Sequence, residues 1–574
     1  MSQERKEASP ARFEPDRYAS AYDRGASRQS GQRTIVPREF TSLGDDTAVV
    51  RALGDIHRLL IFVQRPDGCQ LLAGTGGAAD LATVHEPVTA FVPACPLERL
   101  GSTPFLTDHR LRYAYVAGAM ANGIASVRLV EAIAQSGMLG FFGAAGLSLD
   151  EVERAIDQLA QSLGDAPYGF NLIHTPSEPE VEAGIVDLYI RRGVHLAEAS
   201  AFLDLTLPLV RYRLRGIHRA ADGTIVTPNR LLAKVSRVEV ASKFFAPAPE
   251  RLVAKLLERG DITDDEAQLA RHVPMAQDVT AEADSGGHTD NRPALTLLPT
   301  FLALRNRMQQ KYGFAQELRV GFGGGIATPQ AAAAAFTMGA AYVLVGSVHQ
   351  ACVESGTSDS VRAMLAKAEQ ADVTMAPAPD MFEMGVKVQV LKRGTLFAVR
   401  GAKLFELYRR HGSLDELPPK ERAQLEKTIF RKPLETIWQE TRDYFRARDP
   451  SQAERAEADP KHKMALVFRW YLGLASRWAN SGEPGRELDY QVWCGPAMGA
   501  FNEWARGSAL EAPAERRVAT VALNILYGAA VGLRQGWLRQ QGVTLGPGAL
   551  CSLGSSPLEP TELLDRIRPV ESSV

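Results

Sequence analysis

The 574-residue chain has few cysteines and no long apolar run. Its cysteines are scattered and odd in number, which argues against a disulfide framework or a metal cluster and fits a reducing cytoplasm. They are Cys69, Cys95, Cys352, Cys494 and Cys551. No segment holds the roughly 18 consecutive apolar residues that a membrane span needs. Residues 1–33 are polar and lack the apolar core of a signal peptide, so we expect a soluble cytoplasmic protein with a disordered N-terminal tail.

The chain also lacks an excess of charge of either sign. Its 65 Lys and Arg residues nearly balance 67 Asp and Glu residues, and the net charge is −2. Proteins that mainly bind nucleic acid usually carry clustered basic residues in excess, so nucleic acid is not expected as a partner. With 45% hydrophobic and 23% charged residues the composition is typical of a globular protein, and the length predicts two or three structural units.

A repeating pattern of strand, small-residue loop and helix predicts the central fold. Eight short apolar segments have the composition of strands and alternate with helical segments over residues 111–370, a span typical of a (β/α)8 TIM barrel. The predicted strands are Tyr113–Ala117, Met138–Phe142, Tyr168–Ile173, Val194–Ala199, Leu231–Val235, Asp278–Ala283, Leu318–Phe322 and Tyr342–Val345. An open, doubly wound sheet is the alternative, since alternation alone does not show closure, but eight units favour the barrel.

The flanking segments have different patterns. Residues 34–110 contain short apolar runs between turn residues and predict a small β-rich N-terminal unit. Residues 371–574 predict a connector and a helical C-terminal domain, with amphipathic helices at 416–430, 434–446, 464–478 and 517–539. Residues 380–389 and 391–400 either pair as strands or form the connector. We expect the aromatic residues of the C-terminal domain to pack between helices rather than to line a groove for an acyl group or a partner.

Glycines follow the seventh and eighth predicted strands. Gly323, Gly324 and Gly325 end the seventh, and Gly346 and Ser347 end the eighth, each before a helical segment. Thr328 has the chemistry of a helix N-cap, and Pro329 suits the first turn. Glycines after strands are common in any α/β protein. Two such loops in these places, however, match the phosphate site that TIM barrels build after their last strands.

The loop after the sixth predicted strand carries a titratable side chain. In the segment DSGGHTDNRP, Gly287 and His288 lie between acidic residues. An imidazole can transfer protons near neutral pH, and this loop lies at the carboxyl end of the barrel with the phosphate loops. A structural histidine bonded to Asp284 or Asp290 is the alternative. We take both interpretations forward.

These motifs carry a resemblance. The segments DSGGHTDNRP, GGGIATP, VGSVHQ, APAPDMFEMGVKVQVLKRGT, KHKMALVFRWYLG and DYQVWCGPAMGAFN resemble the PfaD-type trans-acting enoyl reductases of polyketide and polyunsaturated fatty acid synthases. The barrel half is also similar to the FMN-dependent enoyl-acyl carrier protein reductases and nitronate monooxygenases, whose GGH histidine corresponds to His288. The chain departs in one place, with GFGGGIATP where an alanine beside a GG pair is expected, an exchange that keeps the backbone donors.

The resemblance implies a mechanism and its residues. NADPH would reduce FMN, the flavin would deliver hydride to the β-carbon of an enoyl thioester, and a proton would reach the α-carbon, with His288 delivering it or polarising the carbonyl. The resemblance also implies cofactor contacts, with Asn171 at the pyrimidine edge of the flavin and Lys234 beside its negative charge. The remaining contacts are the isoalloxazine turn and the phosphate loops: Gly118, Ala119, Met120, Gly287, Gly323, Gly324, Gly325, Gly346 and Ser347.

The implied partners are an acyl carrier protein with a phosphopantetheine-bound enoyl substrate, synthase modules and a second copy in a homodimer. A basic patch would suit the carrier protein, and six residues are its weak candidates: Arg211, Arg213, Arg215, Lys387, Lys392 and Arg393. Two other functions stay open. One is a nitronate-type flavin oxidase with the same fold and histidine, and the other is a non-catalytic component of a synthase assembly.

Overall fold

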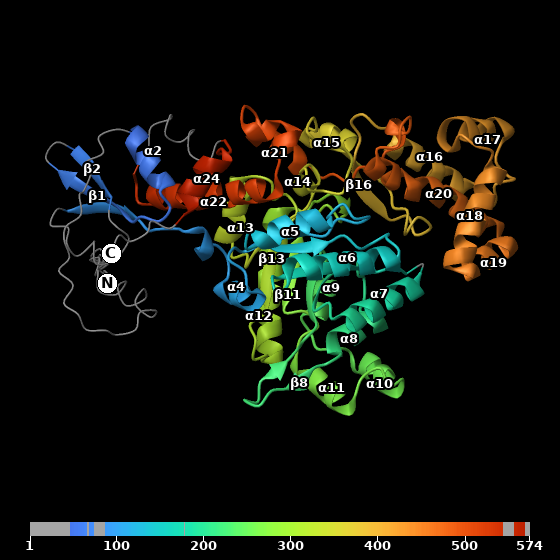
Figure 1. Cartoon of the computed structure of the whole chain (residues 1–574), viewed down its shortest axis with the longest axis horizontal. Coiled ribbons are helices and arrows are strands. Elements are labelled where there is room, and N and C mark those ends of the chain that lie inside the picture. The colour runs from blue at the N-terminus through green and yellow to red at the C-terminus, as the bar shows by residue number, and fades with distance from the viewer. Residues whose placement is uncertain (1–45, 66–67, 74–86, 177, 544–555, 569–574) are drawn as a thin grey trace, which may run out of the picture. The chain divides into compact units, whose positions relative to one another are not determined.

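The computed structural model describes residues 46–65, 68–73, 87–176, 178–543 and 556–568, and the predicted tail lies outside them (Figure 1). The chain forms two compact units. Unit 1 comprises Met1–Pro96, Leu533–Leu553 and Arg568–Val574, and unit 2 comprises Leu97–Gly532 and Gly554–Ile567. Among the described residues, no helix is long and apolar enough to cross a membrane.

Unit 1 is built on a three-stranded antiparallel sheet of order β2-β1-β3. Its elements are α2 (Asp46–Gly54), β1 (Leu60–Arg65), β2 (Gly68–Ala73) and β3 (Val88–Val92). Leu53, Leu60 and Phe62 form its core together with Leu538 from the end of α22 (Val518–Gln540). The buried Arg534 guanidinium donates to the backbone carbonyls of Leu53, Arg58 and Pro93.

The division into units differs from the predicted segments in two places. Residues 97–110 belong to unit 2, because Phe105 and Leu106 of α4 (Thr103–His109) pack in the core of the barrel. Residues 533–553 belong to unit 1, whereas the predicted N-terminal unit comprised only residues 34–110. Long-range packing of the chain ends, which has no local sequence signal, decides both points.

The predicted eight-stranded barrel is confirmed. The strands form a closed barrel of order β10-β11-β13-β14-β4-β5-β6-β7, and all neighbours are parallel. Each predicted strand corresponds to one of them within a few residues. The strands are β4 (Tyr115–Ala117), β5 (Leu139–Phe142), β6 (Tyr168–Ile173), β7 (Leu196–Ser200), β10 (Arg230–Val235), β11 (Asp278–Glu282), β13 (Arg319–Gly323) and β14 (Val343–Val345).

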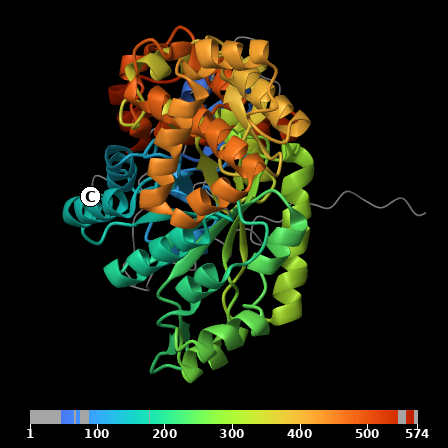
Figure 2. The same ribbon diagram turned by 90° about the vertical axis from the view of Figure 1, so that its right-hand side faces the viewer.

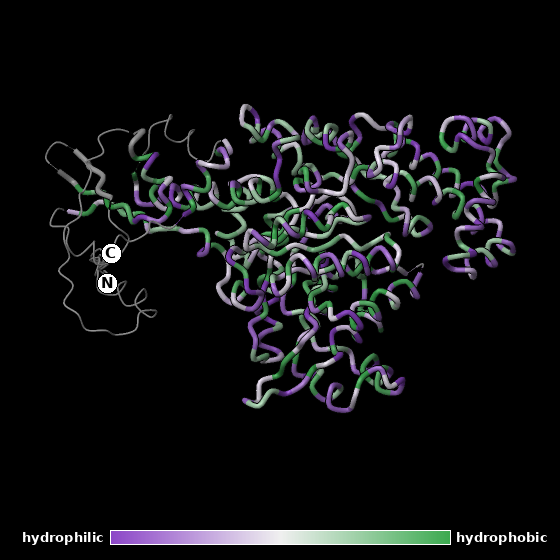
Figure 3. The backbone as a smooth tube through the Cα atoms, viewed as in Figure 1, coloured by the Kyte–Doolittle hydropathy of each residue, from purple (hydrophilic) through white to green (hydrophobic). Residues whose placement is uncertain are grey.

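Helices cover the outside of the barrel, as Figure 3 shows by the polar colour of their outer turns around the apolar strands. Some of them begin at side-chain caps. Ser148 and Glu151 form a capping box, and Thr328 accepts from the Ala331 amide at the start of α13. The helices are α5 (Val127–Gln135), α6 (Leu149–Leu163), α7 (Pro179–Arg192), α8 (Leu207–Leu214), α9 (Val238–Phe244), α10 (Glu250–Glu258), α11 (Asp264–Leu269), α12 (Ala294–Tyr312), α13 (Pro329–Thr337), α14 (Ser347–Gln350) and α15 (Asp359–Leu365).

The amino-terminal end of the barrel holds a buried ionic cluster. Arg319, at the start of β13, donates to both carboxylate oxygens of Asp278, at 2.6 and 3.0 Å, and to Asp108 at 2.6 Å. His109 Nε2 lies 2.8 Å from Asp278 Oδ2. The Arg319 and Asp278 side chains are 2% and 5% exposed.

The polar segment around Asp222 forms a short hairpin of β8 (His218–Arg219) and β9 (Ile225–Val226).

A second small sheet connects the barrel to the C-terminal helices. It has the order β12-β16-β15, with β12 (Gly287–His288), β15 (Val373–Pro377) and β16 (Lys387–Leu391). Residues 380–389 and 391–400 therefore do not pair with each other. Strand β16 pairs with β15 instead, and residues 397–400 begin α16 because Leu396 and Phe397 start an amphipathic helical pattern.

The helices directly after this sheet form one apolar core. They are α16 (Phe397–Arg410), α17 (Pro419–Leu425), α18 (Leu434–Arg448), α19 (Pro450–Ala458) and α20 (Pro460–Ser481). Helices α21 (Ala497–Ala505) and α24 (Pro560–Ile567) follow later in the chain. Residues 426–430, predicted as helix, form a π-helical turn after α17. Phe430, Phe468 and Tyr471 are fully buried in this core. Figure 2 shows α16 to α20 over the end of the barrel opposite β8 and α11.

Candidate active site

A cavity of about 500 Å³ lies at the carboxyl end of the barrel strands. Its walls come from the barrel loops on one side and from α18, α20 and the segment after them on the other. All the predicted site residues except Gly323 line it: Gly118, Ala119, Met120, Asn171, Lys234, Gly287, His288, Gly324, Gly325, Gly346 and Ser347. Gly323 is a buried residue of β13, where an added Cβ would lie 3.2 Å from Thr280 Cγ2.

The loop after β13 needs its glycines for backbone reasons. Gly324 and Gly325 have φ angles of +85° and +80°, which other residues rarely adopt. A Cβ on Gly324 would also lie 2.6 Å from the carbonyl of Ala283, whereas Gly325 and Gly346 face open space. The two loops thus leave room for a ligand to approach the backbone at Gly325 and Gly346, as a phosphate group requires.

The turn after β4 is fixed by backbone hydrogen bonds. The Gly118 amide donates to the Val345 carbonyl at 3.0 Å, and the Ala119 amide donates to Glu198 Oε2 at 3.0 Å. A Cβ on Gly118 would lie 2.6 Å from Leu344 Cδ2. This close packing keeps the turn from Gly118 to Met120 small where it faces the cavity.

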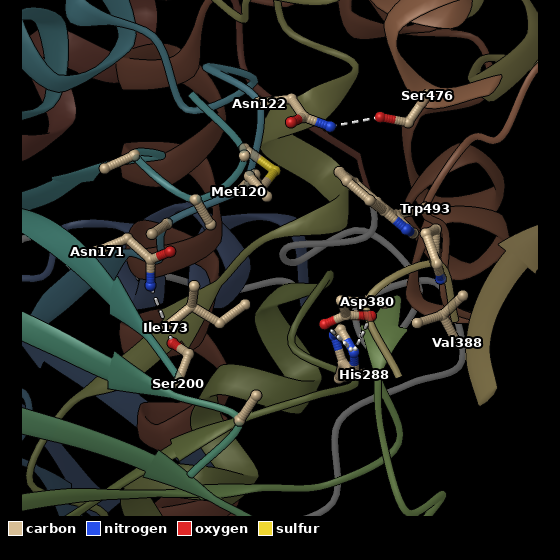
Figure 4. Close-up of a pocket in the computed structure, with 18 of the residues that line it drawn as sticks. Met120, Asn122, Asn171, Ile173, Ser200, His288, Asp380, Val388, Ser476 and Trp493 are labelled. Carbon is tan, nitrogen blue, oxygen red and sulfur yellow. Dashed lines mark hydrogen bonds and ion pairs between the residues drawn. The ribbon is translucent and has the colours of Figure 1, made fainter. Parts of the chain in front are cut away.

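Asn171 lies in β6 with its side chain oriented by the neighbouring strand. Its Nδ2 donates to the Glu198 carbonyl and to Ser200 Oγ, both at 3.2 Å (Figure 4). In the described part of the chain no donor bonds its Oδ1. The amide is therefore held as an acceptor toward the cavity that it lines.

Three charged side chains gather where β7, β10 and β11 end. Glu198 is fully buried; Oε2 accepts from Ala119, and Oε1 has no partner among the described residues. Burial raises the pKa of Glu198 to about 7, although Lys234 opposes the shift. Lys234 Nζ lies 3.5 Å from Glu282 Oε1. Burial lowers the pKa of Lys234, but Glu282 and Glu198 more than offset this, so the lysine stays charged.

Sequence reasoning missed Glu198. The signal that points to it is a carboxylate in the middle of the segment LAEAS, which otherwise has the small and apolar residues of a buried strand. A charged residue at such a position is rare unless it is paired or has a function. Its pairing partners become visible only when the strands are side by side.

His288 lies in the short strand β12, within the segment that the sequence predicted as a loop. It pairs with Val388 of β16, and Nε2 lies 3.3 and 3.2 Å from the two carboxylate oxygens of Asp380 (Figure 4). Burial lowers the pKa of His288, but the Asp380 carboxylate and Glu282 raise it above its ordinary value. The imidazole therefore retains its proton to higher pH than a free histidine.

The alternative that His288 is bonded to Asp284 or Asp290 is wrong. Asp284 accepts from Asn291 and Gln389, both within 2.9 Å, and Asp290 accepts from Ser236 and Arg237. Asp380 lies far along the chain in the quoted APAPD segment, to which we assigned no role from the sequence.

The C-terminal helices form the outer wall of the cavity, so the expected packing role of their aromatic residues holds only in part. Tyr471 and Phe501 are fully buried. Trp470 and Trp493, however, are partly exposed and line the cavity. Asn122 Nδ2 donates to Ser476 Oγ, and Arg477 donates to the Gly146 carbonyl at 3.3 Å, so α20 is tied to the barrel loops.

Three of the candidates for a basic patch are buried or paired with acidic residues. Arg213 is 2% exposed and donates to the carbonyls of Pro274 and Asn229, so it is not a docking residue. Arg211 forms ion pairs with Asp187 and Asp261. Arg393 is likewise paired with acidic side chains.

The fold and cavity together define a class of protein: a (β/α)8 barrel whose glycine loops open onto a cavity that also holds a carboxylate-bound histidine. Family models agree with this class. Residues 103–406 match the nitronate monooxygenase family, and residues 411–490 match the inserted helical domain of [acyl-carrier-protein] S-malonyltransferase.

Two curated relatives are similar over most of this chain. A component of the polyunsaturated fatty acid synthase of a Thraustochytrium species is 48% identical over 84% of this chain and 32% of its own. Polyketide biosynthesis protein PksE of Bacillus subtilis is 48% identical over 87% of this chain and 64% of its own. The chain thus spans less than two thirds of the length of either relative.

A solved structure is also similar. The enoyl reductase domain of MlnA from the macrolactin biosynthesis cluster of Bacillus amyloliquefaciens is 38% identical, covers 78% of this chain and 100% of its own, and has a TM-score of 0.73. The chain belongs to the nitronate monooxygenase family and, within it, to the PfaD-type enoyl reductases.

Proposed function

We propose that this chain is a trans-acting, NADPH-dependent FMN enoyl reductase, which reduces the 2,3 double bond of carrier-protein-bound enoyl thioesters in polyketide or polyunsaturated fatty acid biosynthesis. The observation that carries the proposal is one cavity that joins a glycine cradle, the His288–Asp380 pair and an outer wall of helices. The 38% identity to an enoyl reductase domain supports the reaction class.

The residues that line the cavity suit FMN. The open space at Gly325 and Gly346 suits a phosphate, and the constrained turn from Gly118 to Met120 suits a flat ring system. Asn171 presents an acceptor, which suits the N–H of a pyrimidine edge. Lys234 provides a retained positive charge. Bound FMN would supply the transfer of hydride from NADPH to the β-carbon of the substrate.

His288 supplies the acid of the reaction. Asp380 binds Nε2, which leaves Nδ1 as the atom from which the protonated ring can donate to a ligand. That proton either moves to the α-carbon or stays on Nδ1 in a hydrogen bond that polarises the thioester carbonyl. The raised pKa keeps the ring protonated near neutral pH in either role.

The test is NADPH oxidation by purified protein with crotonyl-pantetheine, with and without added FMN. We expect a yellow flavin spectrum and oxidation that requires both the thioester and FMN. A colourless protein that does not take up FMN would refute the proposal. Replacing Gly324 with Val should prevent flavin binding, because its Cβ would overlap the Ala283 carbonyl.

The match of residues 103–406 to the nitronate monooxygenase family favours a second candidate, a flavin oxidase that acts on nitronates. The same preparation distinguishes the two functions. The oxidase would consume oxygen with an alkyl nitronate and would oxidise little NADPH with crotonyl-pantetheine. The reductase would show the opposite preference.

A further inference from the structure

Helix α20 has a glycine at a position where its structure does not require one. Gly473 lies in the middle of α20, lines the cavity and is exposed to it. An added Cβ would meet no described atom within 4 Å. Glycine inside a helix costs roughly 1 kcal/mol relative to alanine, so its presence here is not explained by the stability of the helix. What the glycine provides is space in the cavity.

Apolar side chains from three helices line the cavity, next to polar ones such as Glu182 and Thr441. The apolar ones are Val181 and Ile185 of α7, Phe445 of α18 and Leu474 of α20. Val181 and Ile185 lie one helical turn apart, so they share one face of α7. We call these four residues and Gly473 the helical wall. The cavity is continuous from this wall to His288 and the glycine loops.

Charged residues border the helical wall. Arg448 Nε lies 2.9 Å from Glu178 Oε2 and joins α18 to α7, and Arg469 lies 3.4 Å from Glu383. Arg477, by contrast, is exposed and donates to a backbone carbonyl, with no carboxylate at ion-pair distance in the described part of the chain. The Arg477 charge nevertheless acts on Glu151, whose pKa it helps to lower, so each of these three arginines has an acidic neighbour.

We propose that the helical wall binds the acyl chain of the enoyl thioester and that the missing side chain at Gly473 sets how large a chain is accepted. This inference rests on the proposed reductase function. An acyl chain is apolar along its length, and the phosphate of the phosphopantetheine arm lies on the other side of the thioester. The chain therefore matches apolar side chains whose neighbouring arginines Arg448 and Arg469 are already paired with carboxylates.

The nucleotide of NADPH is the competing occupant of this space. It would place several anionic and polar groups against Val181, Ile185 and Leu474, which offer no hydrogen bonds, and such desolvation is costly. The acyl chain removes apolar surface from water at the same place. The apolar composition therefore favours the acyl chain, and the experiment includes the nucleotide as an outcome.

The test is the variant Gly473→Leu with substrates of two lengths, crotonyl-pantetheine and dodecenoyl-pantetheine. We expect the ratio of kcat/KM for the long substrate to that for the short one to fall at least about tenfold, because the new side chain occupies the space of several methylene groups. Gly473→Ala should lower the ratio less, which gives a graded series. An unchanged ratio would overturn the inference, as would a rise in the KM for NADPH with the same chain-length profile.

The matched control is Gly536→Leu, which makes the same exchange in α22. Gly536 does not line the cavity, and an added Cβ there also meets nothing within 4 Å. The control should keep the native ratio. Helix propensity favours leucine over glycine in both variants, so both are expected to fold. In Val181→Trp the larger side chain fills part of the same space from α7. This variant should also lower the ratio of kcat/KM for the long substrate to that for the short one.

A binding measurement separates this inference from the proposed function. Saturated dodecanoyl-pantetheine has no double bond to reduce, and its binding is measured by calorimetry on the flavin-loaded protein. Gly473→Leu should weaken its binding at least about tenfold relative to Gly536→Leu. If the native protein reduces no enoyl thioester but shows this difference, the reductase proposal fails and the acyl site stands. Equal binding by both variants refutes the acyl site.

Discussion

The two ends of the barrel hold ionic clusters of opposite design, although strand β11 contributes to both. Strand β11 begins with Asp278 in one cluster and ends with Glu282 in the other. At the amino end, Asp278 receives two bonds from Arg319 and one from His109. At the carboxyl end, Glu198 Oε1 has no partner among the described residues, and Lys234 lies 3.5 Å from Glu282.

This difference separates structural charge from charge available to a ligand. A buried ion pair is tolerated when every lone pair and proton is satisfied, as it is around Asp278. A buried carboxyl with one unsatisfied oxygen is costly, and proteins retain such groups mainly where they bind or react. We therefore expect the amino end of this barrel to stabilise the fold and the carboxyl end to receive the ligands, as in TIM barrels generally.

We expect the largest loss of stability from a variant that breaks the amino-end cluster. Arg319→Met removes the main partner of Asp278, whose pKa burial would raise but Arg319 and His109 hold well below its ordinary value. A buried carboxylate that has lost both hydrogen bonds from Arg319 should lower the free energy of unfolding by about 3–5 kcal/mol, measured by urea denaturation. Turnover per molecule of folded, flavin-loaded protein should not change. Arg506→Met, which breaks an exposed ion pair, serves as the control. A loss no larger than that of the control would contradict the structural assignment.

The next effect concerns the carboxyl end. His288→Ala removes the proton held beside Asp380, and kcat/KM for NADPH-dependent enoyl reduction should fall about a hundredfold to a thousandfold. The visible flavin spectrum should persist, because the glycine loops are unchanged. His218→Ala, in the exposed hairpin, is the matched control. Native activity in the His288 variant would show that the histidine is structural.

Glu198→Gln tests the carboxyl-end cluster through the pH dependence of the free energy of unfolding. The pKa of Glu198 is about 7 in the folded protein and 4.5 in its ordinary state, so the folded state binds more protons between these values. Its stabilising contribution is present below pH 4.5 and is lost as the pH rises to 7. The variant should remove a decline of roughly 2–3 kcal/mol in the free energy of unfolding over this range. Urea denaturation at several pH values measures it, with Glu503→Gln as the exposed control. An unchanged slope would refute the raised pKa.

The smallest effect is a shift in a pH profile. The Asp380 carboxylate raises the pKa of His288 against burial, and Glu282 and Lys234 also face the ring with opposing effects. In Asp380→Asn the pKa of His288 should fall, so the decline of kcat with rising pH should begin about one pH unit lower. Asp415→Asn, which is almost fully exposed, should leave the profile as it is. A uniform loss of activity without a shift would mean that Asp380 does not set the protonation of His288.

Much of the barrel follows from local patterns. The strand segments are apolar and short, and Thr328 caps the following helix where it was predicted to. The cradle glycines were also visible, because positive φ angles at Gly324 and Gly325 demand glycine. Gly323, in contrast, has the same composition signal but packs against Thr280 inside β13. A run of glycines does not show which of them faces a ligand.

The rest required the tertiary structure. Asp380 and His288 are 92 residues apart, and only the pairing of β12 with β16 brings them together. The outer wall of the cavity comes from helices whose apolar faces looked like ordinary packing surfaces, since periodicity does not distinguish a core from a cavity lining.

By itself, the sequence determined the barrel, the positions of its glycine loops and a histidine at its carboxyl end, because these depend on local propensity and backbone geometry. The tertiary structure decided which charges are satisfied. Arg319 completes one cluster and Glu198 is left incomplete in the other, and this depends on which strands become neighbours when the barrel closes. It also decided that Gly473 opens a cavity and does not merely weaken a helix, because only the packing of α7, α18 and α20 over the barrel encloses that space.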